Sequence, residues 1–249
     1  MDSNSENIAP GLGFIPDPHD QRDVTWRAAV APQAISTPNS FKISSVGGVL
    51  NQGATSQCTC YATATLKMHQ EFKEHKKYYK FDPAWLYAIA KSKDGIPDQD
   101  GTYLRIVLAE IQNTGYLAKA ERYKLKDDTH FKIEKYVRLT SIQQVKEALY
   151  HVGPVVFGIT LDDGIYTPDK TGVIPEPNDR TIGGHAMAMV GWNDNKKCQG
   201  SKGAFLVKNS WGAEYGNKGY IWYPYSHFTH YDEWDAWRTV DASELVVEC

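Results

Sequence analysis

The chain has 249 residues, of which 41% are hydrophobic and 23% are charged, and its formal net charge is −3. This composition is typical of a globular chain of one or two domains with a sizeable core, and it excludes overall disorder. The charge balance gives no electrostatic case for nucleic-acid binding, and no run approaches 18 apolar residues, so we expect no membrane span.

The first fifty residues predict extended chain. Residues 1–11 are polar and predict a flexible tail, and they lack the basic and apolar regions of a secretory signal. We therefore expect a cytoplasmic protein or one exported by a non-classical route. We also expect no long helical inhibitory segment before the first helix, because this stretch carries Pro10, Pro16, Pro18, Pro32 and Pro38.

Residues 58–77 predict an amphipathic helix, because an apolar stripe and an opposite charged face both follow helical spacing. The stripe consists of Tyr61, Ala64, Thr65, Met68 and Phe72, and the charged face of Lys67, Lys73, Glu74, Lys76 and Lys77. Cys58 would lie at the positive N-terminal end of this helix.

Helices are predicted next and strands later, an order typical of an α+β fold. Asp82-Pro83 is a cap and first-turn pair, Thr102 is a predicted cap, and Ser141 opens a capping box. Runs rich in branched and aromatic residues predict strands over residues 155–160, 186–192, 204–208 and 220–223. Trp234 and Trp237 are expected to pack onto these strands.

Three short motifs carry side chains suited to nucleophilic catalysis. They are Asn51–Ala62, which contains Gln52 and Cys58; Gly183–Ala186, which contains His185; and Lys208–Gly212, which contains Asn209. A thiol is mostly protonated at neutral pH, so a nucleophilic cysteine needs a helix N-terminus and an imidazole partner. A third group must fix the imidazole tautomer, and donors must face the developing oxyanion.

Together these motifs resemble those of the papain-like cysteine peptidases. His185 follows Cys58 by 127 residues and Asn209 follows it by 151, close to the about 130–150 residues of the papain-like signature. The resemblance implies an α+β papain-like fold over residues 12–249, with a mainly helical lobe at about 42–140. An antiparallel, barrel-like β lobe would comprise about 141–249 and the N-terminal segment. The substrate cleft would lie between the lobes.

The resemblance also implies the role of each residue. Cys58 is the nucleophile, His185 the base and acid, Asn209 the orienting residue and Gln52 an oxyanion donor, while Trp211 covers the His185–Asn209 bond. Substrate contacts are expected from the backbone of Gly101 and Thr102, from a pocket lined by Leu104, Gly158 and Ala186, and from Trp211. No cofactor or metal is expected.

Cys60 is an alternative nucleophile, because Cys60-Tyr61-Ala62 resembles the family's Cys-Trp-Ala core. The six-residue spacing from Gln52 favours Cys58, which leaves Cys60 as a buried apolar thiol. A zinc site at Cys58 and Cys60 would lack a second ligand pair.

Few cysteines remain for disulfides, since only Cys198 and Cys249 lie outside this region. Secreted papain-like enzymes place a bridging cysteine where this chain has Thr55, and its partner segment is replaced by residues 98–103. The chain therefore resembles the bridge-poor bacterial, archaeal and viral branch.

These observations predict a monomeric cysteine endopeptidase that acts on peptide or protein substrates. Two alternatives stay open: a catalytically silent papain-fold binding module, and an amidase, transglutaminase or deubiquitinase with a similar Cys-His site.

Overall fold

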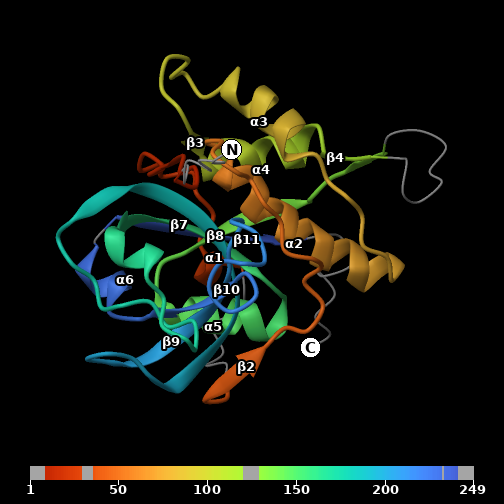
Figure 1. The fold of residues 1–249 in the computed structure, drawn as a ribbon. Coiled ribbons are helices and arrows are strands. Elements are labelled where there is room, and N and C mark those ends of the chain that lie inside the picture. The colour runs from red at the N-terminus through yellow and green to blue at the C-terminus, as the bar shows by residue number, and fades with distance from the viewer. Residues whose placement is uncertain (1–8, 30–35, 120–128, 232, 241–249) are drawn as a thin grey trace, which may run out of the picture.

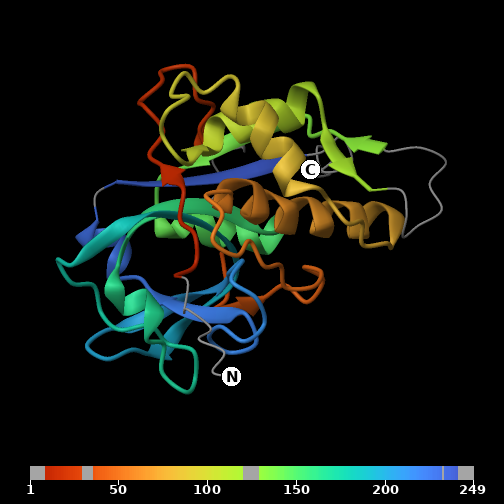
Figure 2. The same ribbon diagram turned by 45° about the horizontal axis from the view of Figure 1, so that its top comes forward.

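The computed structural model describes residues 9–29, 36–119, 129–231 and 233–240. Figures 1 and 2 show two unlike halves, one built mainly from helices and the other from a twisted sheet, with α2 at the boundary between them. The helices are α1 (Trp26–Ala29), α2 (Cys58–His75), α3 (Pro83–Lys91), α4 (Leu104–Asn113), α5 (Ile142–His151), α6 (His227–His230) and the 3-10 helix η2 (Asp163–Tyr166).

The main sheet has seven strands in the order β10-β9-β8-β7-β11-β6, and β2 also pairs with β8; all these pairs are antiparallel. Its strands are β2 (Ser40–Lys42), β6 (Lys135–Leu139), β7 (Val155–Asp162), β8 (Thr181–Lys197), β9 (Lys202–Lys208), β10 (Tyr220–Pro224) and β11 (Trp234–Val240). Two small pairs complete the fold: β1 (Phe14–Ile15) with β3 (Thr102–Tyr103), and β4 (Tyr116–Ala118) with β5 (Thr129–Phe131). The α+β fold predicted from the order of elements is confirmed.

Helix α2 is buried on nearly all sides, which corrects the predicted charged face. Every residue from 58 to 71 except Tyr61 is buried. Lys67 is fully buried, and its Nζ lies 2.7 Å from the Glu71 carboxylate and donates to the Lys132 carbonyl at 2.9 Å. The sequence pattern failed here because a buried Lys is tolerated only when such partners satisfy it, and Lys132 is remote in sequence. The predicted exposure holds only for the last turn, from Lys73 onward.

The predicted helix starts are confirmed in two cases and corrected in one. Asp82 accepts the Trp85 N–H at 3.2 Å, and Ser141 accepts the Gln144 N–H at 3.2 Å, as N-cap side chains do. Thr102 is not a cap: it lies in β3, and α4 begins after Tyr103. The apolar face of α4 is buried, at Leu104, Val107, Leu108 and Ile111.

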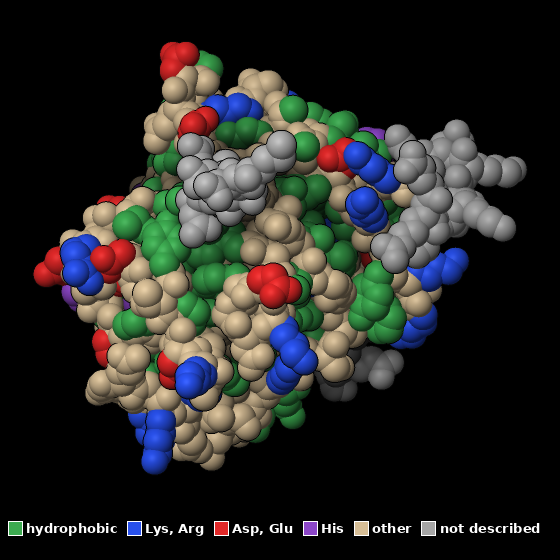
Figure 3. Space-filling model, viewed as in Figure 1, with side chains coloured by type: hydrophobic (Ala, Val, Ile, Leu, Met, Phe, Trp, Pro, Cys, Tyr) green, Lys and Arg blue, Asp and Glu red, His purple; other side chains and the backbone are tan. Residues whose placement is uncertain are grey.

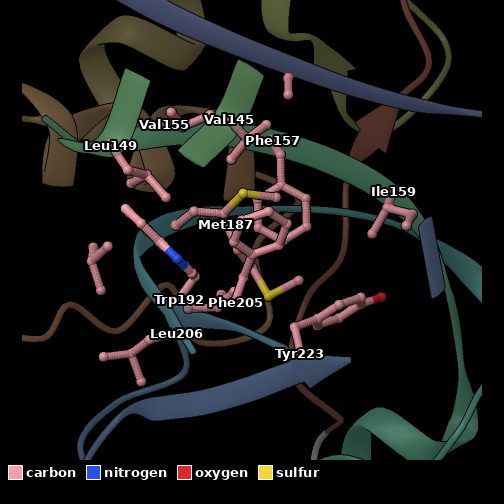
Figure 4. Packing of buried hydrophobic residues seen from close by; sticks show 14 of the residues in the cluster. Val145, Leu149, Val155, Phe157, Ile159, Met187, Trp192, Phe205, Leu206 and Tyr223 are labelled. Carbon is pink, nitrogen blue, oxygen red and sulfur yellow. The ribbon is translucent and has the colours of Figure 1, made fainter. Parts of the chain in front are cut away.

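Two apolar clusters fill the molecule. The larger lies between the sheet and α5, where Val145 and Leu149 of the helix meet Phe157 of β7 and Met187 of β8, as Figure 4 shows. The smaller surrounds α2 and α4 and includes Cys58, Leu104, Ala186 and Phe14. Since Ala186 belongs to β8 and Phe14 to β1, the second cluster joins the helical half to the sheet.

The last described strand, β11, was not among the predicted strands. It pairs with β7 on one side and β6 on the other, and Trp237 is fully buried, so the expectation that the C-terminal tryptophans pack on the sheet is met. The buried Asp235 of this strand accepts from the Asp17 N–H and from the Arg138 guanidinium, and the Trp237 indole N–H donates to Asp17.

Among the described residues, no helix has the length and apolar character needed to span a membrane. On the face seen in Figure 3, lysine and arginine side chains are dispersed among acidic and apolar ones.

The buried Lys67–Glu71 pair should dominate the response of α2 to substitution. Lys67→Met leaves the Glu71 carboxylate buried without its main partner, so we expect a loss of about 3–5 kcal/mol in the free energy of unfolding. Urea denaturation would measure it. The double variant Lys67→Met/Glu71→Leu should recover part of the loss, and Lys73→Ala in the exposed last turn is the control. A loss from Lys67→Met no larger than the control's would contradict this account.

Candidate active site

Cys58 is the first residue of α2, and its thiol is fully buried. The N-cap residue Gln57 makes no side-chain capping bond, so the helix N-terminal amides are not consumed by a cap. The backbone N–H groups of Cys58, Thr59 and Ala186 all act on the Cys58 sulfur. The sulfur therefore lies between the positive end of a helix and β8, beside the residue that follows His185.

His185 and Asn209 are brought together by the pairing of β8 with the end of β9. His185 Nε2 lies 2.9 Å from Asn209 Oδ1, and the same oxygen accepts the Ser210 N–H at 2.7 Å. Because this N–H identifies the amide oxygen, His185 Nε2 must be the donor in the first bond. The imidazole therefore carries its proton on Nε2, and Nδ1 is a buried lone pair with no hydrogen-bond partner.

A cluster of three aromatic rings meets this pair through Trp211. The Trp211 ring lies 4.8 Å from the His185 ring, measured between centroids, and Tyr215 meets Trp211 edge-on at 4.8 Å. Tyr166 of η2 stacks on the other part of Trp211 at 5.7 Å and is 41% exposed. Trp211 thus packs against the imidazole, and Tyr166 extends the aromatic surface to solvent.

Gln52 is held in one orientation by its neighbours. Its Oε1 accepts the Ser210 hydroxyl at 2.6 Å, and its Nε2 donates to the carbonyls of Gly11 and Thr55 at 2.9 and 2.8 Å. The Gln52 N–H also donates to the Ser210 carbonyl at 2.9 Å. Ser210, the residue after Asn209, therefore holds the predicted oxyanion donor Gln52 in place. Both halves of the site thus share one support.

Burial sets the protonation of the resting site. It raises the pKa of the Cys58 thiol to about 12, against the lowering effect of the nearby backbone N–H groups. It also lowers the pKa of His185 to about 4, although the bond to Asn209 acts in the opposite direction. At neutral pH the resting pair is a neutral thiol beside a neutral imidazole, rather than an ion pair.

The N-terminal segment crosses this site, as the red strand in Figure 2 shows. The Gly11 N–H donates to the Gly53 carbonyl, and the Gly11 carbonyl accepts from Gln52 Nε2 and, at 3.3 Å, from Trp211 Nε1. The Gly13 N–H donates to the Gly184 carbonyl at 3.1 Å. Gly11 was predicted to belong to a flexible tail, but both its N–H and its carbonyl are hydrogen-bonded.

Phe14 of the same segment fills the predicted apolar pocket. Phe14 is 4% exposed and packs in one cluster with Leu104 and Ala186. A Cβ placed on Gly158 would lie 2.2 Å from the Phe14 ring, so the ring rests directly on the backbone of β7. The structure therefore brings Leu104, Gly158 and Ala186 together around one aromatic side chain.

Gly101 and Thr102, which form the groove edge beside this segment, are held in place by side chains of α3. The Thr102 N–H donates to the Gly13 carbonyl at 2.9 Å. Gly101 before it is held at both ends: its N–H donates to the Tyr87 hydroxyl at 3.0 Å, and its carbonyl accepts from Lys91 Nζ at 3.1 Å. The Lys91 ammonium also binds the carbonyls of Ile96 and Gln99 and the Asp94 carboxylate. One cation thus organises the whole loop that leads to Thr102.

Cys60 lies two residues further into α2 and faces a different environment. It is fully buried, and burial raises the pKa of its thiol beyond the ordinary range. Its carbonyl accepts the Tyr116 hydroxyl at 2.7 Å, a structural contact within the helical half. The backbone amide of Ala186 acts on the sulfur of Cys58 rather than on that of Cys60.

Four residues that contribute to the site were not predicted. Ser210 orients Gln52, Lys91 and Tyr87 hold the groove edge, and Phe14 occupies the pocket. Ser210 stands within the motif around Asn209, so its position was the available signal. Nothing in the sequence distinguishes Lys91 from the exposed lysines near it.

The described side chains that could share a metal ion converge elsewhere. Glu71, Glu74 and His75 lie at the far end of α2, roughly 20 Å along the helix from Cys58. Glu71 in this group is already paired with Lys67.

Comparison with known proteins decides the family. The family model described as "Papain family cysteine protease" matches residues 37–230, well over half of the chain. The chain belongs to the papain family. The matched range contains Gln52, Cys58, His185 and Asn209, and it excludes the segment that carries Gly11 and Phe14.

Relatives of this papain-family chain include a viral protein. An uncharacterized peptidase C1-like protein of Acanthamoeba polyphaga mimivirus is 28% identical over 209 residues, which cover 72% of this chain and 64% of that protein. Cathepsin S of Bos taurus is 35% identical over 89 residues, covering 35% of this chain and 26% of that protein. The chain therefore spans less than two thirds of the length of these relatives.

Solved structures share the fold. Xylellain, a cysteine protease from Xylella fastidiosa, superposes with a TM-score of 0.77 at 21% identity and covers 94% of this chain and 97% of its own. The cysteine protease and lectin-like domains of Cwp84 from Clostridium difficile give a TM-score of 0.72 at 20% identity, over 94% of this chain and 56% of that one. The predicted papain-like two-lobe fold is confirmed. Among the described residues Cys58, Cys60 and Cys198 are free, and Cys249 lies outside them.

The neutral resting pair predicts a particular pH profile for alkylation. With the pKa of Cys58 raised to about 12 and that of His185 lowered to about 4, little thiolate exists at neutral pH. Labelling of Cys58 by iodoacetamide should be slow between pH 5 and 8 and should rise above pH 9. Peptide mapping by mass spectrometry would follow it. Fast labelling that is independent of pH from 5 to 9 would indicate a preformed ion pair and contradict this description.

The support of the groove edge by Lys91 should be visible in hydrogen exchange. Lys91→Met removes an ammonium that binds three carbonyls and one carboxylate, so amide exchange over residues 94–102 should accelerate at least tenfold. The matched control is Lys93→Met, which removes a half-exposed neighbour that pairs with Glu110 instead. Equal exchange in both variants would show that Lys91 does not hold the loop.

Proposed function

We propose that this chain is a cysteine endopeptidase in which Cys58 is the nucleophile and His185 the general base and acid. The observation that carries the proposal is the tautomer of His185. Asn209 Oδ1, identified by the Ser210 N–H, accepts a hydrogen bond from the Nε2–H of His185, and this leaves the Nδ1 lone pair buried and unpartnered. An imidazole so fixed can accept a thiol proton on one nitrogen only.

In the proposed reaction, His185 Nδ1 removes the thiol proton, and the Cys58 sulfur attacks the carbonyl carbon of a substrate peptide bond. The helix N-terminus and the amides around the sulfur stabilise the thiolate. His185, now protonated, donates its proton to the leaving amine, and a thioester on Cys58 remains. Water activated by His185 then hydrolyses the thioester and restores the thiol.

Gln52 is proposed to stabilise the tetrahedral intermediates. Its Nε2 and the Cys58 backbone N–H would donate to the oxyanion, and Ser210 would hold the amide so that Nε2, rather than Oε1, faces the substrate. Removal of one such donor raises the barrier by roughly 3 kcal/mol in comparable sites.

The path of the N-terminal segment supports an endopeptidase. A chain already passes through the groove, with described residues before Gly11 and after Phe14, so the groove has room for polypeptide on both sides of the site. The apolar pocket at Gly158 supports a preference for substrates with a large apolar side chain.

Substitutions in the proposed machinery should separate chemistry from folding. Cys58→Ala and His185→Ala should abolish turnover of peptide substrates, and Gln52→Ala should lower kcat about 100-fold. Ser210→Ala should lower kcat less, because the Gln52 amide is then free to turn. Thermal unfolding of each variant checks that the fold persists.

Cys60→Ser is the matched control for the nucleophile, since Cys60 is equally buried and two residues away. It should retain activity. Turnover that persists in Cys58→Ala and disappears in Cys60→Ser would move the nucleophile to Cys60, and a folded wild-type protein that never labels or turns over would favour a silent binding module.

A further inference from the structure

We propose that Tyr215 is a positioning residue for the proposed base: its hydroxyl oxygen holds the Asn209 amide in the orientation that leaves Oδ1 to His185. This inference rests on the proposed function, because it concerns how the same imidazole is kept in one tautomer.

The loop between β9 and β10 brings Tyr215 back to Asn209. The Asn209 N–H donates to the Gly219 carbonyl at 3.0 Å, and the Gly219 N–H donates to the Tyr215 carbonyl at 2.8 Å. Gly219 has a φ of 84°, and a Cβ there would lie 2.5 Å from the Val49 side chain, so the loop needs glycine at this point. Two backbone bonds through one residue therefore join Tyr215 to Asn209.

The direction of the Tyr215 hydroxyl is fixed by η2. The hydroxyl donates to the Ile165 carbonyl at 2.6 Å, and η2 is itself held by the Gly164 N–H, which donates to Asp162 Oδ1 at 2.8 Å. A phenol has only one proton to donate. The Tyr215 oxygen therefore presents only lone pairs to its other neighbours.

Asn209 has a donor that matches these lone pairs. Its Oδ1 is used by His185 and by the Ser210 N–H, whereas its Nδ2 is buried and makes no well-aligned hydrogen bond to any described residue. The Asn209 side chain also acts on the Tyr215 oxygen. Burial raises the pKa of this phenol, and the Asn209 side chain lowers it, as an N–H directed at the oxygen does.

The opposite orientation of the amide would disable the proposed base. Asn209 Nδ2 would then face His185 Nε2, which would have to accept, and the imidazole proton would move to Nδ1. That nitrogen could no longer remove the Cys58 proton. The same rotation would place Oδ1 against the Tyr215 oxygen with no proton between the two acceptors. Tyr215 thus disfavours the orientation of Asn209 in which His185 cannot work.

The first test is Tyr215→Phe, which removes the hydroxyl and keeps the ring that meets Trp211 edge-on. Because one hydrogen-bond partner of a buried amide is lost and no substrate contact changes, kcat should fall about tenfold at constant KM. The matched control is Tyr223→Phe. Tyr223 is fully buried, but its hydroxyl has no hydrogen-bond partner among the described residues, so this variant should keep the wild-type kcat. Thermal unfolding checks that both variants fold.

The second measurement reads the tautomer directly. In protein labelled with ¹⁵N-histidine, the ring nitrogens of His185 are assigned by comparison with His185→Ala. The wild type and Tyr223→Phe should show Nε2–H alone, and in Tyr215→Phe roughly a tenth or more of the molecules should carry the proton on Nδ1. An unchanged tautomer in Tyr215→Phe would overturn the inference, whether or not kcat falls.

Asn209→Asp tests whether Nδ2 is the group that Tyr215 holds. The substitution keeps an oxygen for His185 and replaces the Nδ2 donor with an acceptor. Adding Tyr215→Phe to Asn209→Asp should therefore cause no further loss of kcat and no shift of the tautomer. A tenfold loss from Tyr215→Phe in both backgrounds would contradict the proposed contact.

These outcomes separate the two proposals, because the tautomer is measured without turnover. A tautomer that shifts in Tyr215→Phe, in a protein that hydrolyses no peptide, would retain the positioning role and refute the peptidase. Peptide turnover that requires Cys58 but is equal in wild type and Tyr215→Phe, with the same tautomer in both, would do the reverse.

Discussion

The burial of α2 against β8 is the constraint on which the rest of this molecule depends. The contact places the positive end of a helix, at Cys58, beside the strand that carries His185. Because the helix belongs to one half of the fold and the strand to the other, Cys58 and His185 lie at the boundary between two apolar clusters. The helix can lie there only because the buried charge of Lys67 is paired with Glu71 inside the protein.

The two halves are also joined by hydrogen bonds that involve few residues. Ser210 donates one backbone bond to Asn209 and one hydroxyl bond to Gln52, so a single residue orients the partner of the imidazole and the proposed oxyanion donor. A displacement of one half relative to the other would disturb both. This coupling explains why the motif around Asn209 and the motif around Cys58 form one unit although about 150 residues separate them.

Much of the site could be predicted because its chemistry is local in sequence. Cys58, His185 and Asn209 stand in short motifs of distinctive residues, and the caps at Asp82 and Ser141 depend on neighbours three residues away. The misjudged features depend on remote partners. The burial of Lys67 requires the Lys132 carbonyl, and the role of Thr102 in a strand rather than a cap requires Gly13, some ninety residues earlier. Strand β11 was missed because its buried Asp235 is satisfied by Asp17 and Arg138, which are remote in sequence. No local pattern reports such contacts.

The ammonium of Lys91 has a consequence for the conditions in which this groove can keep its shape. Secreted papain-like enzymes have a disulfide near this loop. In this chain the carbonyls of Ile96, Gln99 and Gly101 instead accept hydrogen bonds from the Lys91 ammonium. Breaking a disulfide requires only a reductant, while a lysine bound to backbone carbonyls is indifferent to redox potential. The shape of this loop therefore does not depend on redox potential: a reducing agent that acts on the Cys58 thiol leaves the contacts of Lys91 in place.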